Sequence, residues 1–329
     1  MGEFLLKRLA LCALILVFTT FMVYALMFSL PSSFVENRAR ELSQKPGSMK
    51  SAQEWVAELN VKYGFDKGLV GGYFVWLRSA VKGDFGESWY WTVLVTAKFK
   101  EVIWYSFILG LITFVLEIAI AIPLGVVAAR KQYSFTDYTV TVISLVGISL
   151  PTFFTATILK LVFAMQLKWF DPFGMQGRNY HVLTDFGQLL DMAKHFVLPA
   201  LTLVIISIGS LMRYTRANML EVLNSDYIRT ARAKGLSERR VINHHAFRNT
   251  MIPLISILGG SLPGLFSGAL ITETLFAIRG IGFASFHSMV NGDIPFTMFY
   301  LAFIAILTLL GNLISDILYA VVDPRVRVH

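Results

Sequence analysis

The chain alternates between long apolar stretches and polar segments, and six of the apolar stretches approach or exceed the length of a membrane span. The hydrocarbon core of a bilayer is about 30 Å thick, so a helix that crosses it needs roughly 20 mostly apolar residues. The pattern therefore predicts an all-α, polytopic membrane protein with six transmembrane helices. The predicted spans cover residues 9–30, 102–129, 139–167, 196–212, 251–276 and 297–322. Pro123 and Pro151 lie inside the second and third spans, where we expect a tilt or a kink.

The first span follows Lys7 and Arg8, as the apolar region of a secretory signal peptide would. Its apolar run is 22 residues long, and no Ala-x-Ala cleavage site follows it. The apolar region of a signal peptide has only about 7 to 15 residues. We therefore interpret this stretch as a retained membrane anchor.

The composition agrees with a membrane protein, because 55% of the residues are hydrophobic, 15% are charged and the mean hydropathy is +0.62. A soluble domain carries about 25% charged residues, which excludes most soluble enzymes and disordered chains. The net charge of +8 would suggest nucleic acid in a soluble chain, but here the basic residues follow the topology. With the N-terminus inside, the inside segments hold 14 Lys and Arg, and the short outside loops hold four. Both termini are therefore expected in the cytoplasm, with no nucleic-acid partner.

The polar segments divide the chain into three parts. These are residues 1–30, the N-terminal tail and first span; residues 31–100, an extracytoplasmic segment; and residues 101–329, a five-helix core with a cytoplasmic loop at about 213–250. In the extracytoplasmic segment, Ser51 and Glu54 have the spacing of a capping box and predict a short helix. A small helical cap on the membrane and a docking surface for an external partner both remain open for this segment.

The cytoplasmic loop carries helix start and stop signals. Asn224, Ser225 and Asp226 are good N-cap residues, and Gly235 is a good helix terminator, so we expect a short helix over residues 226–234. Its small side chains, which would let another surface approach the backbone, are Thr230, Ala231 and Ala233. A helix of this kind suits a groove in another protein. The alternative is a solvated surface helix.

Motifs for catalysis and for metal binding are missing from the sequence. There is no P-loop run, and Gly280-Ile-Gly282 lacks the third glycine of a dinucleotide fingerprint. His244 and His245 are adjacent rather than four residues apart, so a helical zinc site is not expected. The sequence therefore predicts neither a catalytic residue nor a metal site.

The predicted spans contain four ionisable residues that need a structural or functional partner. A charge at mid-membrane is costly, so each such residue is by default a candidate for a cavity or a helix contact. The four residues are Glu117, Lys160, Glu273 and Asp316. A proton-coupled carrier would need more intramembrane carboxylates or histidines than these, which favours an energy source outside the chain.

The cytoplasmic loop resembles the corresponding loop of inner-membrane permease subunits of binding-protein-dependent ABC importers. The similar run extends from Arg213 through Arg229-Thr-Ala-Arg-Ala-Lys-Gly235 to Pro253. More narrowly, it is similar to the dipeptide and oligopeptide permease family, which also includes nickel importers. Other motifs that resemble landmarks of this family are Gly83-Asp-Phe-Gly-Glu-Ser88, Leu198-Pro-Ala-Leu201, Glu273-Thr-Leu-Phe276 with Gly280-Ile-Gly282, and Asp323-Pro-Arg325.

The resemblance implies a transport subunit of the cell membrane and not an enzyme. Such a subunit pairs with a second homologous permease and forms half of the translocation pathway. Two cytoplasmic ATPases hold ATP and magnesium, and an extracytoplasmic solute-binding protein delivers the solute. No cofactor is then expected on this chain itself.

In that family the short helix of the long loop is the coupling helix, which sits in a cleft of the ATPase. Carried onto this sequence, the residues implied in coupling are Asp226, Tyr227, Arg229, Thr230, Ala231, Ala233, Gly235 and Leu236. The broader importer motif Glu-Ala-Ala-x-x-x-Gly falls on Arg229, Thr230, Ala231 and Gly235, and its first two positions depart from the motif. This departure resembles the peptide branch, so a glutamate contact to the ATPase is not assumed.

Proline and glycine inside the spans suggest where a water-filled path interrupts the helices. With the intramembrane carboxylates added, the candidate path residues are Glu117, Ser149, Pro151, Thr152, Ser261, Pro263, Gly264 and Glu273. Ordinary kinks packed between helices are the alternative at each proline or glycine.

The function that the resemblance implies is the import of peptides by alternating access. In this hypothesis the ATPases move the loop helix, and the fourth and fifth spans rock against the partner permease. A nickel importer or another small-solute importer of the same family is an alternative. A self-contained secondary carrier is the less favoured alternative from another class.

Overall fold

The computed structural model describes residues 2–30 and 33–322, and within these ranges every regular element is a helix. Strand-like pairing among the described residues is limited to one antiparallel bridge between Glu87 and Leu94. The prediction of an all-α protein is therefore confirmed. The predicted terminal motif Asp323-Pro-Arg325 lies outside the described residues.

The chain falls into two compact units. The first is Met1–Ile103 with Ala284–Leu309, and the second is Trp104–Phe283 with Leu310–His329. The three parts predicted from the sequence divide the chain by membrane side, which these units do not test, so that division stays a prediction.

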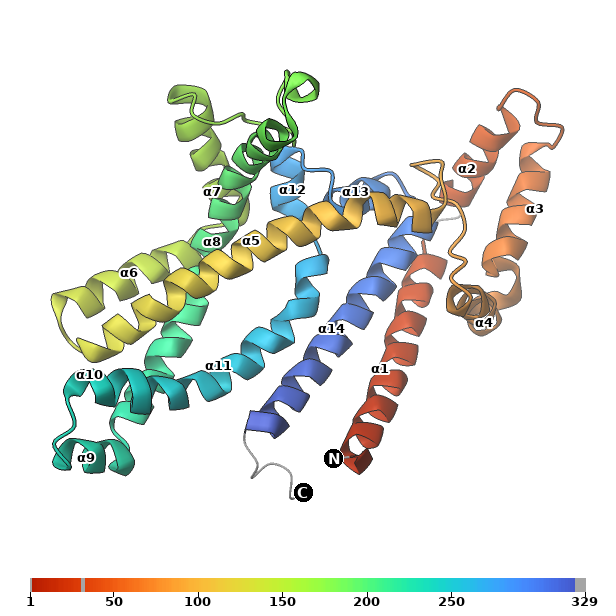
Figure 1. Ribbon diagram of the computed structural model, residues 1–329. Helices are drawn as coiled ribbons and strands as arrows, with labels where there is room; N and C mark the ends of the chain where they lie inside the picture. The colour runs from red at the N-terminus through yellow and green to blue at the C-terminus, as the bar shows by residue number, and fades with distance from the viewer. Residues whose placement is uncertain (1, 31–32, 323–329) are drawn as a thin grey trace. The chain divides into compact units, whose positions relative to one another are not determined.

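Among the described residues, five helical runs are long and apolar enough to cross a membrane. They are α1 (Gly2–Phe28), α5 (Val95–Arg130), α8 (Asp185–Leu223), the run Glu238–Phe266 and α14 (Ile294–Val322). The run Glu238–Phe266 consists of α10 (Glu238–Arg240), the π-helix η4 (Val241–Ala246), α11 (Phe247–Ser261) and the 3₁₀-helix η5 (Leu262–Phe266). A sixth span results if α6 (Phe135–Ser149) is counted together with α7 (Thr152–Leu159) and its π-helical continuation η2 (Lys160–Gln166). The structure thus agrees with the predicted six spans (Figure 1).

The third predicted span is sharply bent between α6 and α7, where the helix axes meet at 103°. Pro151 lies at the bend, and Leu150 before it is extended, with φ −79° and ψ 128°. Proline lacks an amide hydrogen and disfavours the helical conformation of the residue that precedes it. The expected interruption at Pro151 is therefore confirmed. By contrast, α5 continues through Pro123.

The helix that contains the fourth predicted span, residues 196–212, extends beyond that span at both ends. Helix α8 begins after Thr184, whose side-chain oxygen accepts the amide hydrogen of Gly187 at 3.3 Å, and it continues to Leu223. Hydropathy detects only the apolar middle of such a helix, because the polar turns at both ends lie outside the hydrocarbon core.

The fifth predicted span, residues 251–276, is wrong at its outer end. The helical run stops at Phe266, and α12 (Leu270–Phe276) is a separate short helix. Gly268 makes the turn between them with φ +79°, a conformation that glycine adopts at little cost. A hydropathy profile does not detect this turn, because the residues around it are apolar. Glu273 consequently lies in α12 and not near the end of a continuous span.

A fully buried carboxylate, that of Glu273, holds this interruption together. Its Oε1 accepts hydrogen bonds from the Ser106 hydroxyl at 2.7 Å and from the amide of Ala269 at 2.9 Å. Its Oε2 accepts the amide hydrogen of Phe283 at 2.9 Å. The Ser106 hydroxyl in turn accepts the amide hydrogen of Ile281 at 2.8 Å. One glutamate therefore connects α5, the start of α12 and the start of α13 (Ile281–Val290).

In the second unit, α6 packs closely along α8. A Cβ atom added at Gly147 would lie 2.5 Å from the carbonyl oxygen of Ile205, and one added at Gly209 would lie 2.4 Å from that of Ser144. Such glycines let two helix backbones approach each other in a membrane protein. Near the N-terminus of α6, the Asp137 carboxylate accepts two hydrogen bonds of 2.7 Å from the guanidinium of Arg216 in α8.

In the first unit, short helices form the segment predicted to be extracytoplasmic. They are α2 (Ser33–Ser43), α3 (Ala52–Tyr63), the 3₁₀-turn η1 (Phe65–Lys67) and α4 (Gly68–Val81). The capping box at the start of α3 is confirmed, since Glu54 accepts the amide hydrogen of Ser51 at 2.7 Å. The hydrogen bonds from Ser51 hold the pKa of Glu54 below its usual value. The buried aromatic residues that join these helices to α1 are Tyr24, Tyr63, Tyr73, Trp76 and Trp89.

A second fully buried carboxylate, that of Asp293, lies at the N-terminus of α14 in the first unit. It accepts amide hydrogens from Trp89 at 2.9 Å and from Tyr90 at 3.2 Å, and it also binds the Ser88 hydroxyl. It caps α14 as well, accepting the amide hydrogen of Phe296 at 3.3 Å. Asp293 therefore fixes the turn that follows the Gly83–Ser88 motif.

We predict that Asp293→Asn destabilises the protein by roughly 2–3 kcal/mol. The NH₂ group of asparagine is a hydrogen-bond donor, and it would replace a carboxylate oxygen that accepts hydrogen bonds from several donors. The matched control is Glu87→Gln, the same acid-to-amide change at an exposed side chain next to Ser88, which Asp293 binds. Thermal unfolding in detergent measures the difference, and equal midpoints for the two variants would contradict the role assigned to Asp293.

We also predict that Gly280→Ala destabilises the protein by roughly 1–3 kcal/mol through overpacking. A Cβ atom there would lie 2.3 Å from the Ser106 hydroxyl oxygen and 2.5 Å from Oε2 of Glu273. Gly264→Ala is the control, since no atom lies within 4 Å of the added Cβ at that position. The thermal midpoint should fall by several degrees for Gly280→Ala only. An unchanged midpoint would contradict the tight packing around Glu273, since the side chains there would then move aside at little cost.

Candidate functional site

The loop that is predicted to be cytoplasmic contains the expected short helix, α9 (Asp226–Ala233). Ser225 is its N-cap by backbone conformation, although the Ser225 hydroxyl donates to the Val222 carbonyl at 2.6 Å and does not cap the helix. Gly235 follows with φ +76°, the left-handed conformation expected of a glycine terminator. The predicted helix over 226–234 is thus confirmed to within one residue at its end.

The inner face of α9 packs onto its own chain. Ile228 and Ala231 are buried in an apolar cluster, and Leu236 packs against its edge. The other buried members of this cluster are Ala129, Met219, Val241, Ile242 and Ala246. Ala231, which the sequence suggested as a point of close approach for another surface, is therefore covered by this chain and serves to anchor the helix.

The outer face of α9 is open. Its exposed residues include the implied coupling residues Asp226, Tyr227, Arg229, Thr230 and Ala233, with Gly235 exposed just beyond. Tyr227 is the large hydrophobic side chain of this face, and 47% of it is exposed. Arg232 donates two hydrogen bonds to Glu238, at 2.8 and 3.2 Å, which closes the turn around Gly235. The helix is therefore held on one side and presented on the other.

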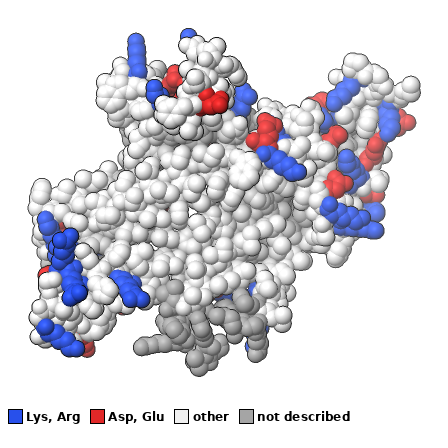
Figure 2. All heavy atoms as spheres, viewed as in Figure 1, with Lys and Arg blue, Asp and Glu red and all other residues white. Residues whose placement is uncertain are grey.

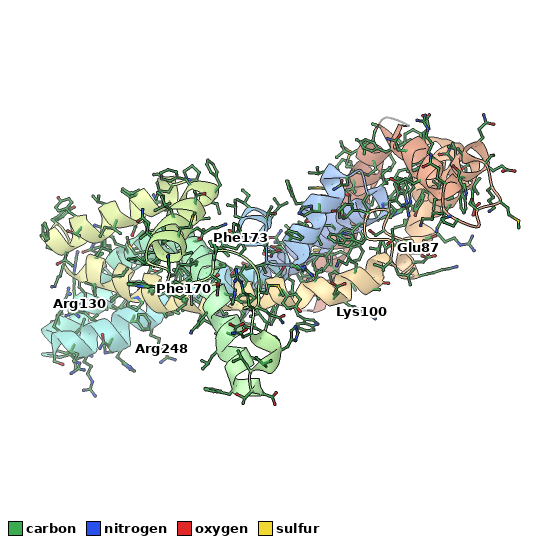
Figure 3. The ribbon with its side chains drawn as sticks, turned by 90° about the horizontal axis from the view of Figure 1, so that it is seen from above. Glu87, Lys100, Arg130, Phe170, Phe173 and Arg248 are labelled. Carbon is green, nitrogen blue, oxygen red and sulfur yellow. The ribbon has the colours of Figure 1, made fainter. Side chains whose placement is uncertain are left out.

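Basic side chains surround α9 at this end of the second unit. Exposed Lys and Arg residues there are Arg130, Lys131, Arg229, Arg232, Lys234, Arg239 and Arg240. Figure 2 shows blue side chains gathered at the lower left, over α9 and α10. Seen from above, the labelled Arg130 and Arg248 lie on the same side of the second unit (Figure 3). These are the basic residues from which the sequence predicts a cytoplasmic location for the loop, and that orientation stays a prediction.

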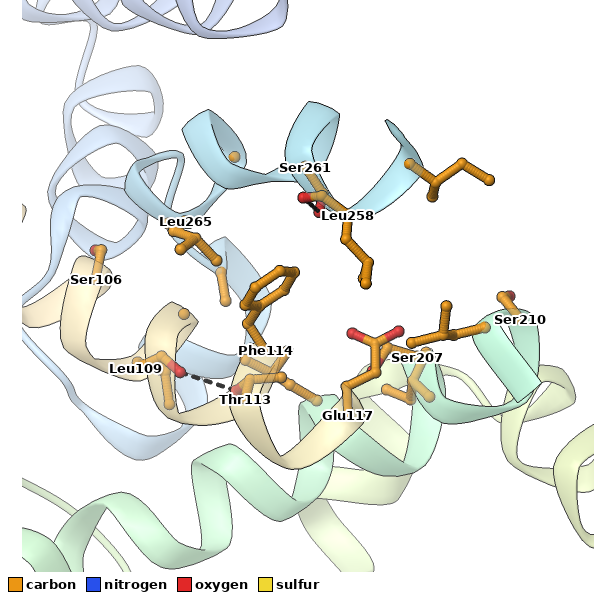
Figure 4. Close-up of a pocket in the computed structure, with 18 of the residues that line it drawn as sticks. Ser106, Leu109, Thr113, Phe114, Glu117, Ser207, Ser210, Leu258, Ser261 and Leu265 are labelled. Atoms are coloured by element: carbon orange, nitrogen blue, oxygen red, sulfur yellow. Dashed lines mark hydrogen bonds between the residues drawn. The ribbon is translucent and has the colours of Figure 1, made fainter. Parts of the chain in front are cut away.

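A cavity of about 600 Å³ lies in the second unit between α5, α8 and the run from α11 to η5. Its lining is mostly apolar, with hydroxyl groups and one carboxylate, that of Glu117 (Figure 4). The polar lining residues are Ser106, Thr113, Glu117, Thr152, Ser207, Ser210, Tyr214 and Ser261. A concave, largely apolar pocket with a few polar groups is the usual form of a site for a small molecule.

Four of the eight residues predicted for a path line this cavity, namely Glu117, Thr152, Ser261 and Gly264. The other four do not. Ser149 is exposed and its hydroxyl donates to the Leu145 carbonyl at 2.8 Å, and Pro151 lies at the bend between α6 and α7. Pro263 is buried in η5, and Glu273 is buried in its cradle of hydrogen bonds. Pro151 marked a helix break correctly, whereas α5 continues through Pro123. Neither proline nor glycine indicated which face of a helix meets the cavity.

The missed lining residues Ser106, Gly110 and Thr113 share a periodic signal with Glu117, which was predicted. Ser106, Gly110, Thr113 and Glu117 are spaced by four, three and four residues, which places them on one face of α5. Ser207, Ser210 and Tyr214 follow the same spacing on α8. A polar stripe at helical spacing inside an apolar span would have identified both faces.

Lys160, another charged residue inside a predicted span, lies away from this cavity lining. Its ammonium donates to the Leu275 carbonyl at 2.7 Å and lies 3.7 Å from the ring centre of Phe173. The contact joins η2 to the end of α12. Among the residues that the structure describes, no group of three or more His, Cys, Asp or Glu side chains is arranged to hold a metal ion.

Known proteins share this sequence over most of its length. The family described as binding-protein-dependent transport system inner membrane component matches residues 121–328. The chain is 35% identical over 331 residues to the oligopeptide transport system permease protein AppB of Bacillus subtilis, a match that covers 99% of this chain and 100% of AppB. It is 33% identical over 275 residues to the oligopeptide transport system permease protein OppB of Haemophilus influenzae, with 83% and 86% covered. It is 32% identical over 346 residues to the dipeptide transport system permease protein DppB of Escherichia coli, with 99% of each covered.

The family match covers more than half of the chain, and these relatives exceed 30% identity over most of it. These similarities agree with the multi-pass helical fold. The chain belongs to the family of inner membrane components of binding-protein-dependent transport systems, and it is a permease component of such a system.

Proposed function

We propose that this chain is one of two permease subunits of an ATP-driven peptide importer, and that the cavity between α5, α8 and α11 is its half of the translocation pathway. The proposal of a peptide substrate is supported by the relatives, which are named as oligopeptide and dipeptide permeases. A second homologous permease supplies the other half. A wide cavity with hydroxyl groups and little charge suits peptides, whose backbones are polar and whose side chains vary.

The observation that carries the proposal is the presentation of α9. Its buried face is fixed by Ile228 and Ala231, and its open face carries Tyr227 among basic residues. Two partner ATPases, which bind and hydrolyse ATP with magnesium, receive this face in a cleft. The chain itself carries no nucleotide and no other cofactor. A helix anchored in this way passes on a displacement that a flexible loop would absorb.

The connections of α9 lead directly to the cavity. Helix α8 precedes α9 and contributes Ser207 and Ser210 to the lining, whereas the run Glu238–Phe266 follows it and contributes Ser261. Closure of the ATPases on ATP therefore moves two walls of the cavity together. We propose that this movement alternates the cavity between outward and inward access.

The basic surface around α9 supports a cytoplasmic location for this end of the second unit. In the same orientation both termini are cytoplasmic. The helices α2, α3 and α4 then lie outside the membrane, where an extracytoplasmic solute-binding protein docks and releases its peptide.

The first test replaces the glycine that ends α9. Gly235→Val should lower peptide uptake and binding-protein-stimulated ATP hydrolysis on the order of tenfold, because a side chain in the left-handed conformation costs about 1–2 kcal/mol. No atom lies within 4 Å of an added Cβ at Gly235, so the effect comes from the backbone and not from a clash. Gly235→Asn, which tolerates this conformation, should retain most of the activity.

The measurement is uptake and hydrolysis by the complete complex reconstituted with its binding protein. The assignment of α9 as the coupling element is wrong if Gly235→Val matches the unaltered complex in both assays.

The second test removes the exposed aromatic side chain of α9. Tyr227→Ala should weaken association of the permeases with the ATPases at least about tenfold, since tyrosine is a frequent anchor of protein interfaces. Tyr133→Ala is the control, because Tyr133 is even more exposed, at 74%, but lies in the turn between α5 and α6. The ATPase retained on the tagged permeases through a gel-filtration column measures the effect. Equal retention by both variants would place the ATPase contact elsewhere.

A further inference from the structure

The cavity carries a single fixed charge among its lining residues. Its residues include no lysine and no arginine, and Glu117 supplies the one carboxylate. In Figure 4 the Glu117 side chain extends from α5 into the cavity, with Phe114 and Leu258 on either side. A charge in the middle of a span is costly, and such residues generally face a cavity and bind a partner there. The described lining offers Glu117 no cationic side chain as that partner.

The neighbours of Glu117 do not neutralise it. Ser207 is the polar neighbour of the Glu117 carboxylate, and its hydroxyl donates to the Val204 carbonyl at 3.4 Å. Most of the lone pairs of the carboxylate therefore remain available, because a carboxylate accepts about four hydrogen bonds. Glu117 is only partly buried, so the carboxylate is accessible from the cavity.

The hydroxyl groups around Glu117 also present hydrogen-bond acceptors to the cavity. Thr113 donates its hydroxyl hydrogen to the Leu109 carbonyl at 2.9 Å, and Ser261 donates to the Leu258 carbonyl at 2.8 Å (Figure 4). A hydroxyl has one hydrogen and two lone pairs, so each of these groups presents lone pairs alone to the cavity. The cavity therefore offers acceptors and a negative charge, and it suits a ligand that is rich in donors and positively charged.

We propose that Glu117 binds the primary ammonium group of the substrate during its passage, the α-ammonium of a peptide or the ammonium of a lysine side chain. This inference rests on the proposed function of the cavity as a peptide path. An ammonium carries three donors in a compact charge, so it satisfies the carboxylate together with nearby hydroxyl acceptors. Glu117 is then a specificity-determining residue within the permease itself, separate from the selection made by the binding protein.

Zero-length crosslinking tests the contact directly. A carbodiimide activates a carboxylate, and an amine in contact with it forms an amide. The complex of permeases and ATPases is treated with carbodiimide and millimolar trialanine, without the binding protein, so that delivery does not limit access. Mass spectrometry should find trialanine attached to Glu117. N-acetyl-trialanine, which lacks the amine, and the variant Glu117→Gln should give no adduct at this position. Absence of the trialanine adduct on Glu117 would overturn the proposal.

Transport provides the second readout. Glu117→Gln should reduce the turnover of trialanine uptake by about tenfold, the size expected for loss of a charged hydrogen bond. The control Glu101→Gln makes the same change at an exposed position near the start of α5 and should leave turnover unaltered. Unchanged turnover for Glu117→Gln would contradict a role in transport.

A cavity-filling variant separates this inference from the proposed function. Ser261→Trp fills the path and should abolish uptake whatever Glu117 does, while the complex still assembles. If Ser261→Trp abolishes uptake but Glu117→Gln has no effect and no adduct forms, the path stands and the ammonium site is wrong. If Ser261→Trp leaves uptake intact, the cavity is not the path, and both proposals fail.

Discussion

The need to satisfy backbone amides away from water governs the irregular parts of this protein. A helix satisfies its own amides, but a chain that leaves the helix inside an apolar region needs other acceptors. In the second unit Glu273 supplies them, accepting the amides of Ala269 and Phe283 together with the Ser106 hydroxyl. In the first unit Asp293 does the same for the amides of Trp89 and Tyr90. Each buried charge is costly unless it is hydrogen-bonded, and each is here fully engaged.

The shape of the cavity follows from the Glu273 cradle. Because the chain turns at Gly268, the helical run of α11 ends early, and Ser261 and Gly264 reach the cavity from its last turns. Ser106 and Ala269, which bind Glu273, are themselves lining residues. The same hydrogen bonds that permit the interruption therefore fix one wall of the cavity. Glu273, predicted as a path residue, lies behind this wall and is not part of the cavity lining.

The sequence was sufficient to predict helix ends that depend only on neighbouring residues. The capping box at Ser51 and the terminator at Gly235 were found because caps depend on residues close together in the chain. The apolar pattern found the spans but not the turn at Gly268, because that turn is stabilised by Glu273 and Ser106, and Ser106 lies on a distant helix. Half of the residues predicted for a path line the cavity, and most of the lining was not predicted. Which side of a span faces a cavity depends on packing partners, and only the periodic polar stripe of Ser106, Thr113 and Glu117 recorded it in the sequence.

Movement at the proposed ATPase contact can reach the cavity without a long chain of side-chain contacts. Claims of coupling across a protein usually depend on a chain of side-chain contacts that must be shown to act together. Here Ile228 and Ala231 of α9 pack on Val241 and Ile242 of the π-helix η4, which continues directly into α11 and Ser261. A π-helical segment is a common site of functional distortion in a helix. The proposed contact element α9 is therefore packed against, and covalently joined to, the helical run that forms one wall of the cavity. A displacement of α9 must either move that wall or break the buried contacts of Ile228, and the burial of Ile228 favours movement of the wall.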